Sequence, residues 1–398
     1  MKKIKPSINF AGILNPGMRV FDVIMRTEYG TSYNSYVVKG AEKTAIIEAS
    51  HRSFSRLYGE GLEEALEGRT PDYLILNHVE PDHSGSVACL LERYPNLQVL
   101  ASQAAAIYLK NIVNREDFKP SIVRDGDSLD LGGKTLQFIS APFLHWPDSI
   151  FSYLPEEKTV FSCDFLGAHY CEPGVLDREI LYAPEYFAAL KYYYDCIFGP
   201  FAPYVRAGLQ KLKALDFDTV CTSHGPVLTK DGALGRVLEL YESWSAEKQA
   251  GPARIPIFYC SAYGNTKSLA QAVREGVLGA IPDAEVPLYN IIEHDLNALA
   301  EEMNGSDAFL IGSPTINREA VPPAWQLLSL ADAINIQKRP VALFGSFGWS
   351  GEAVPHLSER LQSLKCAVFE QQLKVCFVPT QGDLAAARAF GEAFAKGI

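Results

Sequence analysis

A string of nine residues, starting at position 77, constrains the fold of this chain more than any other feature. It reads Asn77-His78-Val79-Glu80-Pro81-Asp82-His83-Ser84-Gly85 and lies between the apolar run YLIL and a segment with helical spacing. A short apolar run of this kind is typical of a buried strand. Four potential metal ligands fall within six residues at the end of that strand, so they can converge on one small volume. The string therefore predicts a strand–loop–helix unit that carries a metal site.

Three further candidate ligands occur in the same setting. His145 follows the strand-like run LQFIS, Asp164 ends the run TVFSCD, and His224 follows DTVCT. Open sheets place their ligands at the carboxyl ends of strands, which is where all of these residues are expected to lie. Four of the eight histidines in the chain belong to this ordered pattern. Any one of these residues alone would be read as a satisfied core histidine or a helix-capping aspartate, but together they favour a metal centre.

The mixture of ligands indicates a pair of iron ions. Carboxylates offset the charge of two metals and can bridge them, while imidazoles fill outer positions and leave sites vacant for a small ligand. Asp164 is the candidate bridge, and Glu80 and Asp82 are candidate terminal oxygen ligands. The candidate nitrogen ligands are His78, His145 and His224, with His83 left open. His169, in the run DFLGAH, is a candidate catalytic residue in the substrate pocket or behind the metal ligands.

This pattern resembles the metallo-β-lactamase fold, whose zinc hydrolases carry HxHxDH followed by His, Asp and His. Here Glu80 stands where those enzymes have the second histidine. The form HxExDH, followed by His145, Asp164 and His224, resembles the flavodiiron proteins, also called A-type flavoproteins. A hard oxygen ligand in place of a nitrogen favours iron over zinc. The resemblance implies an αββα sandwich with two non-haem iron ions, and in that family the residue matching His83 is not always a ligand.

The character of the sequence changes near residue 250. The polar stretch SAEKQAGPAR contains Gly-Pro, which is typical of a linker. Strand-like runs then alternate with helical stretches, and this pattern predicts a doubly wound parallel sheet. The expected strands are 255–260, 284–288, 308–312, 341–345 and 374–378. We therefore expect two α/β domains, a metal domain at 1–250 and a second domain at 254–398.

Three loops of the second domain predict a flavin site. Each is expected at the carboxyl end of a strand, so that they surround one crevice. The first precedes a helix, lacks the lysine of a nucleotide-triphosphate loop and lacks GxGxxG, so it suits one terminal monophosphate such as that of FMN. Trp349 either lies against the isoalloxazine or is a surface aromatic. The loops are Ser261-Ala262-Tyr263-Gly264-Asn265-Thr266, Ser313-Pro314-Thr315-Ile316-Asn317 and Ser346-Phe347-Gly348-Trp349-Ser350-Gly351. They resemble flavodoxin, and the resemblance spans residues 254–398.

Composition excludes several classes of protein. A formal net charge of −11 argues against nonspecific nucleic-acid binding. No apolar run is long enough for a membrane span, and the first residues lack the apolar region of a secretory signal, so we expect a cytoplasmic protein. None of the eight cysteines forms a CxxC pair, which excludes a rubredoxin-type iron site or a zinc ribbon within the chain.

The resemblance implies an oxidoreductase that reduces O2 to water, NO to N2O, or both, with electrons relayed through FMN. It also implies a head-to-tail homodimer or a dimer of dimers, because flavin and irons of one chain are too far apart in that family. The expected electron donor is a separate rubredoxin, or a reduced deazaflavin coenzyme. Two alternatives remain at this point: a zinc-dependent hydrolase with an attached flavodoxin domain, and a gas carrier or sensor without turnover. The choice between O2 and NO is open.

Overall fold

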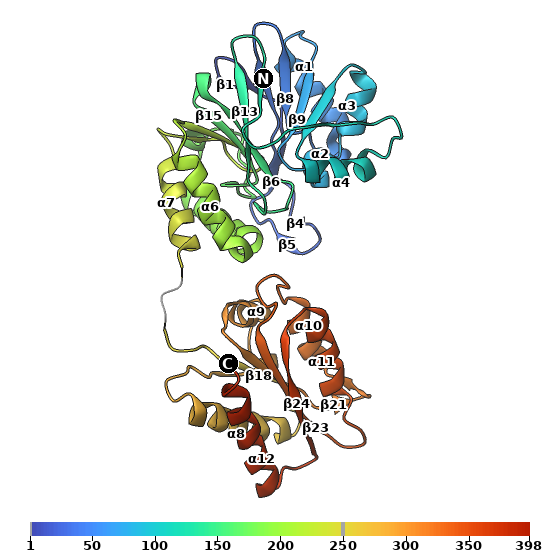
Figure 1. The fold of residues 1–398 in the computed structure, drawn as a ribbon, viewed down its shortest axis with the longest axis vertical. Coiled ribbons are helices and arrows are strands. Elements are labelled where there is room, and N and C mark those ends of the chain that lie inside the picture. The colour runs from blue at the N-terminus through green and yellow to red at the C-terminus, as the bar shows by residue number, and fades with distance from the viewer. Residues whose placement is uncertain (1, 248–250) are drawn as a thin grey trace. The chain divides into compact units, whose positions relative to one another are not determined.

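The computed structural model describes residues 2–247 and 251–398, and the chain divides into two compact units, 1–247 and 248–398 (Figure 1). Most of the linker predicted at 245–254 is described, but residues 248–250 lie outside the described residues. No helix among the described residues combines the length and the apolar character needed to cross a lipid bilayer.

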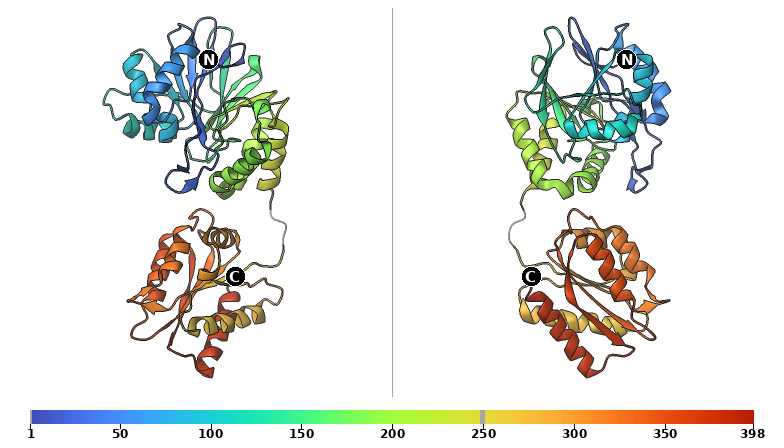
Figure 2. Two further views of the ribbon diagram at one scale, coloured as in Figure 1. Left: turned by 180° about the vertical axis from the view of Figure 1, so that it is seen from behind. Right: turned by 45° about the vertical axis from the view of Figure 1, so that its right-hand side comes forward.

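The N-terminal unit is built on two facing sheets (Figures 1 and 2). Side chains of both sheets share one buried core, which includes Tyr36, Ile75, Phe138 and Phe161. The seven-stranded sheet has the order β1 (Lys2–Lys5), β2 (Ile8–Phe10), β7 (Tyr36–Lys39), β8 (Thr44–Ile47), β9 (Tyr73–Leu76), β10 (Gln98–Ala101), β11 (Ser121–Ile122). The six-stranded sheet has the order β12 (Ser128–Asp130), β13 (Thr135–Ser140), β14 (Ile150–Leu154), β15 (Thr159–Cys163), β16 (Thr219–Thr222), β17 (Leu228–Thr229).

Helices cover the outer faces of both sheets, which makes an αββα sandwich (Figure 2). The central strands β8, β9 and β10 pair in parallel and are mostly apolar, as expected where both faces of a sheet are covered. The helices of this unit are α1 (Ser55–Leu66), α2 (Pro81–Ser84), α3 (Val87–Arg93), α4 (Gln103–Val113), α5 (Ala183–Tyr193), α6 (Ala202–Lys213) and α7 (Leu234–Ser245).

Residues 184–215, a long and aromatic-rich stretch with helical spacing in the sequence, do not form one continuous helix. The chain forms α5, a π-helical turn at Tyr194–Phe198, a 3-10 turn at Gly199–Phe201 and then α6. Pro200 and Pro203 explain the break, because proline has no backbone N–H and is tolerated only in the first turn of a helix. Each of these prolines occupies that position in the turn or helix that it begins.

The strand-like run MRVFDVIM does not form a single strand either. It folds into a small hairpin of β4 (Val20–Phe21) and β5 (Met25–Arg26). Asp22 and Val23 at its tip have positive φ angles of 46° and 58°. Two successive left-handed residues form the tight turn whose twist matches a hairpin, although valine is an unfavourable residue in that conformation. The hairpin leaves the Val23 side chain exposed.

The C-terminal unit has one parallel five-stranded sheet with helices on both faces (Figure 1). Helices α8 and α12 share a core on one face, and α9, α10 and α11 share a core on the other. The sheet order is β19 (Leu288–Asn290), β18 (Ile257–Tyr259), β20 (Phe309–Gly312), β23 (Pro340–Phe347), β24 (Ala367–Cys376). The helices are α8 (Asn265–Ala280), α9 (Leu296–Gly305), α10 (Pro322–Ser329), α11 (Ala353–Ser363) and α12 (Gln381–Ala395). This confirms the predicted αββα sandwich followed by a doubly wound sheet.

Two strand boundaries in this unit differ from the prediction. The strand expected at 284–288 begins at Leu288, directly after Pro287, which has no N–H for the ladder. The strand expected at 374–378 is longer and starts at Ala367. Its middle residues, Glu370, Gln371 and Gln372, are polar and exposed because β24 lies at the edge of the sheet. An edge strand lacks the apolar run that marks a buried one.

Candidate metal and flavin sites

The first group of ligand atoms gathers at the end of β9. The Oε2 atom of Glu80 lies 3.2 Å from Nε2 of His78 and 3.2 Å from Nε2 of His145. His78 is fully buried, whereas the side chains of Glu80 and His145 are 13% and 14% exposed. This group is therefore the part of the centre that opens to the exterior.

The second group lies deeper in the unit. The two oxygens of Asp82 point at two different imidazoles: Oδ2 is 3.0 Å from Nε2 of His224, and Oδ1 is 3.3 Å from Nε2 of His83. These three side chains are at most 5% exposed. Within the described part of the chain, both Asp82 oxygens and the His83 Nε2 atom are buried without a hydrogen-bond partner. Buried polar atoms without a hydrogen-bond partner require an explanation, and a bound metal ion would provide the missing partner.

Asp164 faces both groups at once. Its Oδ2 lies 3.7 Å from Nε2 of His78 and 3.6 Å from Nε2 of His145. Its Oδ1 lies 3.4 Å from Nε2 of His224 and 3.2 Å from Nε2 of His83. Donor atoms bound about 2.1 Å from one metal ion lie roughly 3.0 to 3.5 Å from one another, so each group fits one metal. One carboxylate with an oxygen toward each group is the arrangement of a bridging ligand.

The sheet and one short helix bring these residues together. Asp82 and His83 occupy the first turn of α2, directly beyond β9. Asp164 and His224 follow the parallel neighbours β15 and β16, which brings both residues to the same end of the sheet. Gly225 has a positive φ of 76°, and a Cβ there would lie 2.7 Å from the carbonyl oxygen of Ala168. Only glycine therefore fits beside His224.

Outer contacts fix the orientation of two imidazoles. Nδ1 of His78 lies 3.1 Å from Oδ2 of Asp148, which also accepts the backbone N–H of Val79 at 3.0 Å. Nδ1 of His224 donates to the carbonyl oxygen of Ser32 at 2.6 Å. Each contact leaves Nε2 pointing at the candidate metal position, as is usual for ligating histidines.

Three polar residues that the structure places around the ligands were not predicted from the sequence. They are Asp148, Tyr193, whose hydroxyl donates to Oδ1 of Asp164 at 3.0 Å, and Glu48. Asp148 could have been found, because it is the acidic residue in HWPDS, three positions after His145. Tyr193 and Glu48 carry no local sequence signal, since α5 and β8 are distant in sequence from the ligands.

The electrostatics of the cluster favour ionised carboxylates. Burial alone raises the pKa of Asp164, but His83 and the other imidazoles lower it well below its ordinary value. Burial likewise acts to raise the pKa of Glu80, and the adjacent His145 and His78 reverse this and lower it. Burial and the neighbouring Asp164 raise the pKa of the Tyr193 hydroxyl well above its ordinary value. Tyr193 therefore stays protonated and can donate its hydrogen bond to Asp164.

His169 lies next to the second group. Its ring is 4.8 Å from that of His224 and 4.4 Å from that of Phe21, and its Nδ1 is 2.8 Å from Oγ1 of Thr31. The Nε2 atom is buried and has no hydrogen-bond partner in the described chain. Burial and the charge of His224 lower the pKa of His169 well below its ordinary value, so it is neutral. Its catalytic role stays a prediction.

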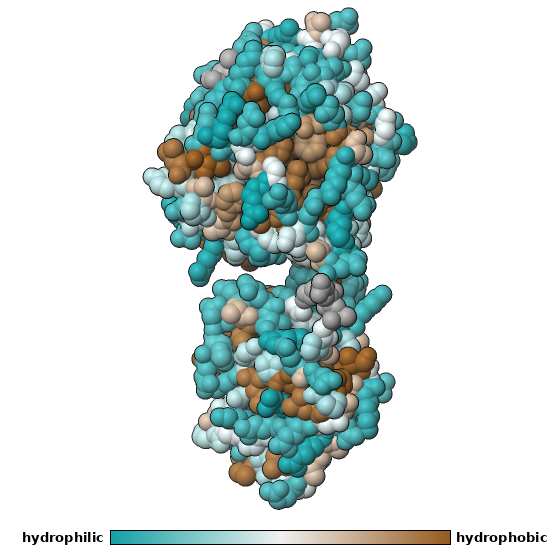
Figure 3. Space-filling view, turned by 90° about the vertical axis from the view of Figure 1, so that its left-hand side faces the viewer, coloured by the Kyte–Doolittle hydropathy of each residue, from teal (hydrophilic) through white to brown (hydrophobic). Residues whose placement is uncertain are grey.

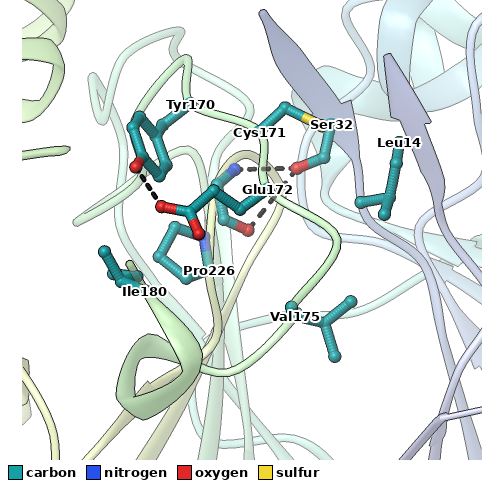
Figure 4. A pocket seen from close by; sticks show the side chains of 10 residues that line it. Leu14, Ser32, Tyr170, Cys171, Glu172, Val175, Ile180 and Pro226 are labelled. Carbon is teal, nitrogen blue, oxygen red and sulfur yellow. Dashed lines mark hydrogen bonds between the residues drawn. The ribbon is translucent and has the colours of Figure 1, made fainter. Parts of the chain in front are cut away.

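A separate cavity lies on the far side of Gly225 and Pro226 (Figure 4). It is lined by Ser32, Tyr170 and Glu172, among others. The Tyr170 hydroxyl points to the Glu172 carboxylate, which also accepts the backbone N–H groups of Leu181 and Tyr182. These polar groups satisfy one another, and no ligand atom of the metal groups lines this cavity.

The hairpin of β4 and β5 packs against the open side of the centre. The Asp22 carboxyl hydrogen-bonds with that of Glu80, and partial burial together with this neighbour raises the pKa of Asp22 to about 7. The backbone N–H of Arg26 donates to the Tyr192 hydroxyl at 3.4 Å. Val23 and Ile24, at the tip, are 92% and 81% exposed. An apolar tip therefore stands beside the exposed ligands.

The three loops predicted to bind flavin follow β18, β20 and β23, which are neighbours in the parallel sheet. One hydrogen bond joins the first loop to the third, and another joins the second loop to the start of α11, two residues after the third loop. Oγ1 of Thr266 lies 2.8 Å from Oγ of Ser346, and the backbone N–H of Ala353 donates to Oγ1 of Thr315 at 3.3 Å. The loops therefore form one connected edge at the carboxyl ends of the strands, as predicted for a nucleotide-type ligand.

The first of these loops can hold a phosphate. Gly264, with a φ of 86°, stands at the N-cap of α8 and has no side chain that could cap the helix. Ser261 Oγ accepts the backbone N–H of Lys267 at 3.2 Å, so the loop folds back over the first turn. Helix N–H groups that lack a cap attract a phosphate. Tyr263 and Trp349 are 92% and 98% exposed, so both aromatic rings are free to pack against a flat ring system.

Two family models match the chain. The ODP family beta lactamase model matches residues 31–225, and the flavodoxin model matches residues 257–391. The first match contains all seven candidate metal ligands, and the second contains all three candidate flavin loops.

Named relatives match over nearly the whole length. The chain is 49% identical to a flavo-diiron protein of Clostridium acetobutylicum, over 100% of this chain and 99% of the relative. It is 33% identical to an anaerobic nitric oxide reductase flavorubredoxin of Vibrio vulnificus, covering 93% of this chain and 75% of the relative. Among solved structures, the rubredoxin oxygen:oxidoreductase of Desulfovibrio gigas matches with a TM-score of 0.73 and 25% identity, covering 100% of this chain and 98% of that one.

Proposed function

This chain belongs to the flavodiiron proteins, and on that premise we propose that it reduces dioxygen to water, nitric oxide to nitrous oxide, or both. Its cofactors are FMN and a non-haem di-iron centre. We propose further that electrons reach the iron centre through the FMN. When bound, the two groups supply four reducing equivalents and open positions for a diatomic ligand.

One observation supports this proposal above the others: the two oxygens of Asp164 face two separate groups of ligand atoms. A single bridging carboxylate holds two metals a short, fixed distance apart, as a reaction on a diatomic or on two NO molecules requires. Glu80 adds an oxygen ligand to the exposed group, which favours iron over zinc and thus oxidoreduction over hydrolysis.

The protein side chains hold and shield this centre. Tyr193 donates a hydrogen bond to Oδ1 of Asp164 and so favours the ionised form of that carboxylate and fixes its orientation. His169 presents a neutral imidazole with a free nitrogen beside the deeper group. Most of the ligand side chains are buried, which excludes water from all but the side of Glu80 and His145.

The test of this function compares the two gases. The anaerobically purified, iron-loaded protein is reduced and mixed with O2 or NO in a stopped-flow instrument, while flavin absorbance reports electrons consumed. We expect repeated turnover with at least one gas while reductant remains. A single reoxidation per protein would indicate a carrier or sensor, and two zinc ions without iron would indicate a hydrolase. The two relatives named above carry the names of both reactions, so both gases must be tried.

The electron donor is proposed to be a separate protein or reduced coenzyme. The relative of Desulfovibrio gigas is named for rubredoxin, and we propose a rubredoxin here, with a reduced deazaflavin as the second candidate. The rate of flavin reduction by each purified donor distinguishes them.

We also propose a head-to-tail homodimer, because each unit exposes apolar residues around its site. Apolar patches are visible on the face of both units that Figure 3 shows. On the metal unit these are Val23 and Ile24 of the hairpin tip. On the flavin unit they are Tyr263, Trp349 and Phe377, which are 92%, 98% and 60% exposed. Apolar residues that ring a functional site are typical of an interface. A second copy in the opposite direction would cover both surfaces.

Ile24→Glu tests this dimer. We expect the variant to sediment as a monomer, with unchanged iron and FMN content, and to pass electrons from flavin to iron at least about tenfold more slowly. Leu57→Glu is the matched control, because Leu57 is an exposed leucine on α1, away from the hairpin. A wild-type monomer that turns over at the full rate would contradict the dimer.

A further inference from the structure

A buried cluster lies behind the deeper ligand group. Glu48 follows β8 and is 1% exposed, and one of its oxygens, a ring nitrogen of His83 and the sulfur of Cys163 lie within 4.8 Å of one another. Oε1 of Glu48 accepts the backbone N–H of Asn77 at 3.0 Å. Oε2 is buried and has no hydrogen-bond partner among residues 2–247 and 251–398. A carboxyl oxygen without a partner therefore stands beside His83, where a buried polar atom requires a hydrogen-bond partner.

The histidines of the two groups differ in how the nitrogen away from the metal is held. A ligating imidazole donates its other N–H to a carboxylate or carbonyl, which fixes the ring and its tautomer. Asp148 serves His78 in this way, and the Ser32 carbonyl serves His224. The group of this kind beside His83 is the Glu48 carboxyl. The neighbouring Cys163 sulfur is a weak acceptor and already receives a hydrogen bond from Ser223 Oγ at 3.3 Å.

We propose that Glu48 is a positioning residue whose Oε2 accepts the Nδ1–H of His83 and thereby holds Nε2 as a ligand of the deeper metal. Nε2 of His83 already faces Oδ1 of both Asp82 and Asp164, at 3.3 Å and 3.2 Å. With its proton fixed on Nδ1, the ring has a lone pair on Nε2 for the metal. This inference rests on the proposed di-iron function. It makes Glu48 the residue that enables His83 to bind the metal.

Glu48→Gln tests the inference with a side chain of nearly the same shape. The amide oxygen can still accept from Asn77, but the amide group then offers N–H donors to His83. Nδ1 of His83 must then be unprotonated to accept this hydrogen bond. The ring proton therefore moves to Nε2, and Nε2 can no longer bind the metal. Anaerobic titration of the iron-free protein with Fe2+ is expected to show one site unchanged and one weakened by about 10- to 100-fold. Glu157→Gln, which alters another buried carboxyl bonded to Ser7 and Lys134, should leave both affinities unchanged.

A double-mutant cycle separates positioning from a general structural effect. If Glu48 acts through His83, then His83→Asn and His83→Asn with Glu48→Gln should bind iron equally. Additive losses would overturn the inference. A crystal structure of the iron-loaded wild type provides a check that does not depend on variants folding: Nδ1 of His83 must lie within about 3.2 Å of Oε2 of Glu48. If Glu48→Gln binds two iron ions with unchanged affinity, only this inference is contradicted. If the wild-type protein binds no iron, the proposed function is contradicted.

Discussion

Replacing Asp164 by asparagine is expected to remove at least one of the two iron ions and to lower gas reduction by more than about 100-fold. Loss of an outer partner of a metal ligand already weakens binding by about 10- to 100-fold, and Asp164 faces both ligand groups directly. Asparagine keeps the size of the side chain but loses the charge and one of the two oxygens. The four imidazoles would then face each other with less negative charge among them.

Iron per chain, measured by elemental analysis, and turnover with O2 and NO check this expectation. FMN content and the flavin spectrum should not change, because the flavin loops belong to the other unit. Asp216→Asn is the matched control, since the Asp216 side chain is 79% exposed and pairs with Lys158. A variant that retains two irons and full turnover would remove Asp164 from the centre.

The candidate ligands could be predicted in part from a simple rule of sheet geometry. Asp164 and His224 follow the parallel neighbours β15 and β16, and parallel strands end at one edge of their sheet. His78 follows β9 in the other sheet, so its approach to Asp164 depends on how the two sheets pack. His145 is placed by the loop after β13, and the run LQFIS marks that strand equally well.

The residues around the ligands could not be predicted in the same way. Tyr193 reaches Asp164 from α5, 29 positions further along the chain, and Glu48 reaches His83 from the end of β8. Their roles depend on tertiary packing, which no local pattern records. The hairpin at Asp22 was missed for a related reason: its turn uses Asp-Val, whereas the usual signal for such a turn is Asn-Gly or Asp-Gly.

The same distinction holds for the fold. The buried strands β18, β20 and β23 were predicted close to their true positions, because burial on both faces gives continuous apolar runs. The edge strand β24 and the break between α5 and α6 were predicted poorly. An edge strand is half solvated, and a π-helical turn depends on the packing of the helix rather than on its residues alone.

Removing the iron is expected to leave a metal unit that becomes less stable as the pH rises above about 6.5. Burial by itself lowers the pKa of His83, but Asp82 and Asp164 reverse this and raise it from 6.5 to about 10. Burial also opposes the charged form of His78, and Asp148 and Glu80 raise its pKa well above 6.5. A histidine with a raised pKa stabilises the fold fully below its unfolded value, and that contribution is lost as the pH rises toward the folded value.

Over its whole shift from 6.5 to about 10, the effect of His83 alone is on the order of 5 kcal/mol, since one pKa unit corresponds to about 1.4 kcal/mol. The carboxylates contribute the opposite dependence of stability on pH. Asp164 and Glu80 have lowered pKa values, so their contribution is present above about 4.5 and is lost as the pH falls. The iron-free unit should therefore be most stable between about pH 4.5 and 6.5.

Denaturant unfolding of the iron-free protein between pH 5 and pH 9 measures this directly, with the transition of the flavin unit as an internal reference. His83→Gln should flatten the decline above pH 6.5, because it removes the group that gives up its proton. Iron-loaded protein should show little of this decline, since ligating imidazoles are already deprotonated, and iron binding below pH 9 should release protons. If the stability of the iron-free unit instead rises from pH 6.5 to 9, the imidazoles are not charged in the absence of metal. The carboxylates could not hold protons in that range either, because protonated carboxyls in the folded unit would also make its stability fall as the pH rises, and iron would then bind without releasing protons.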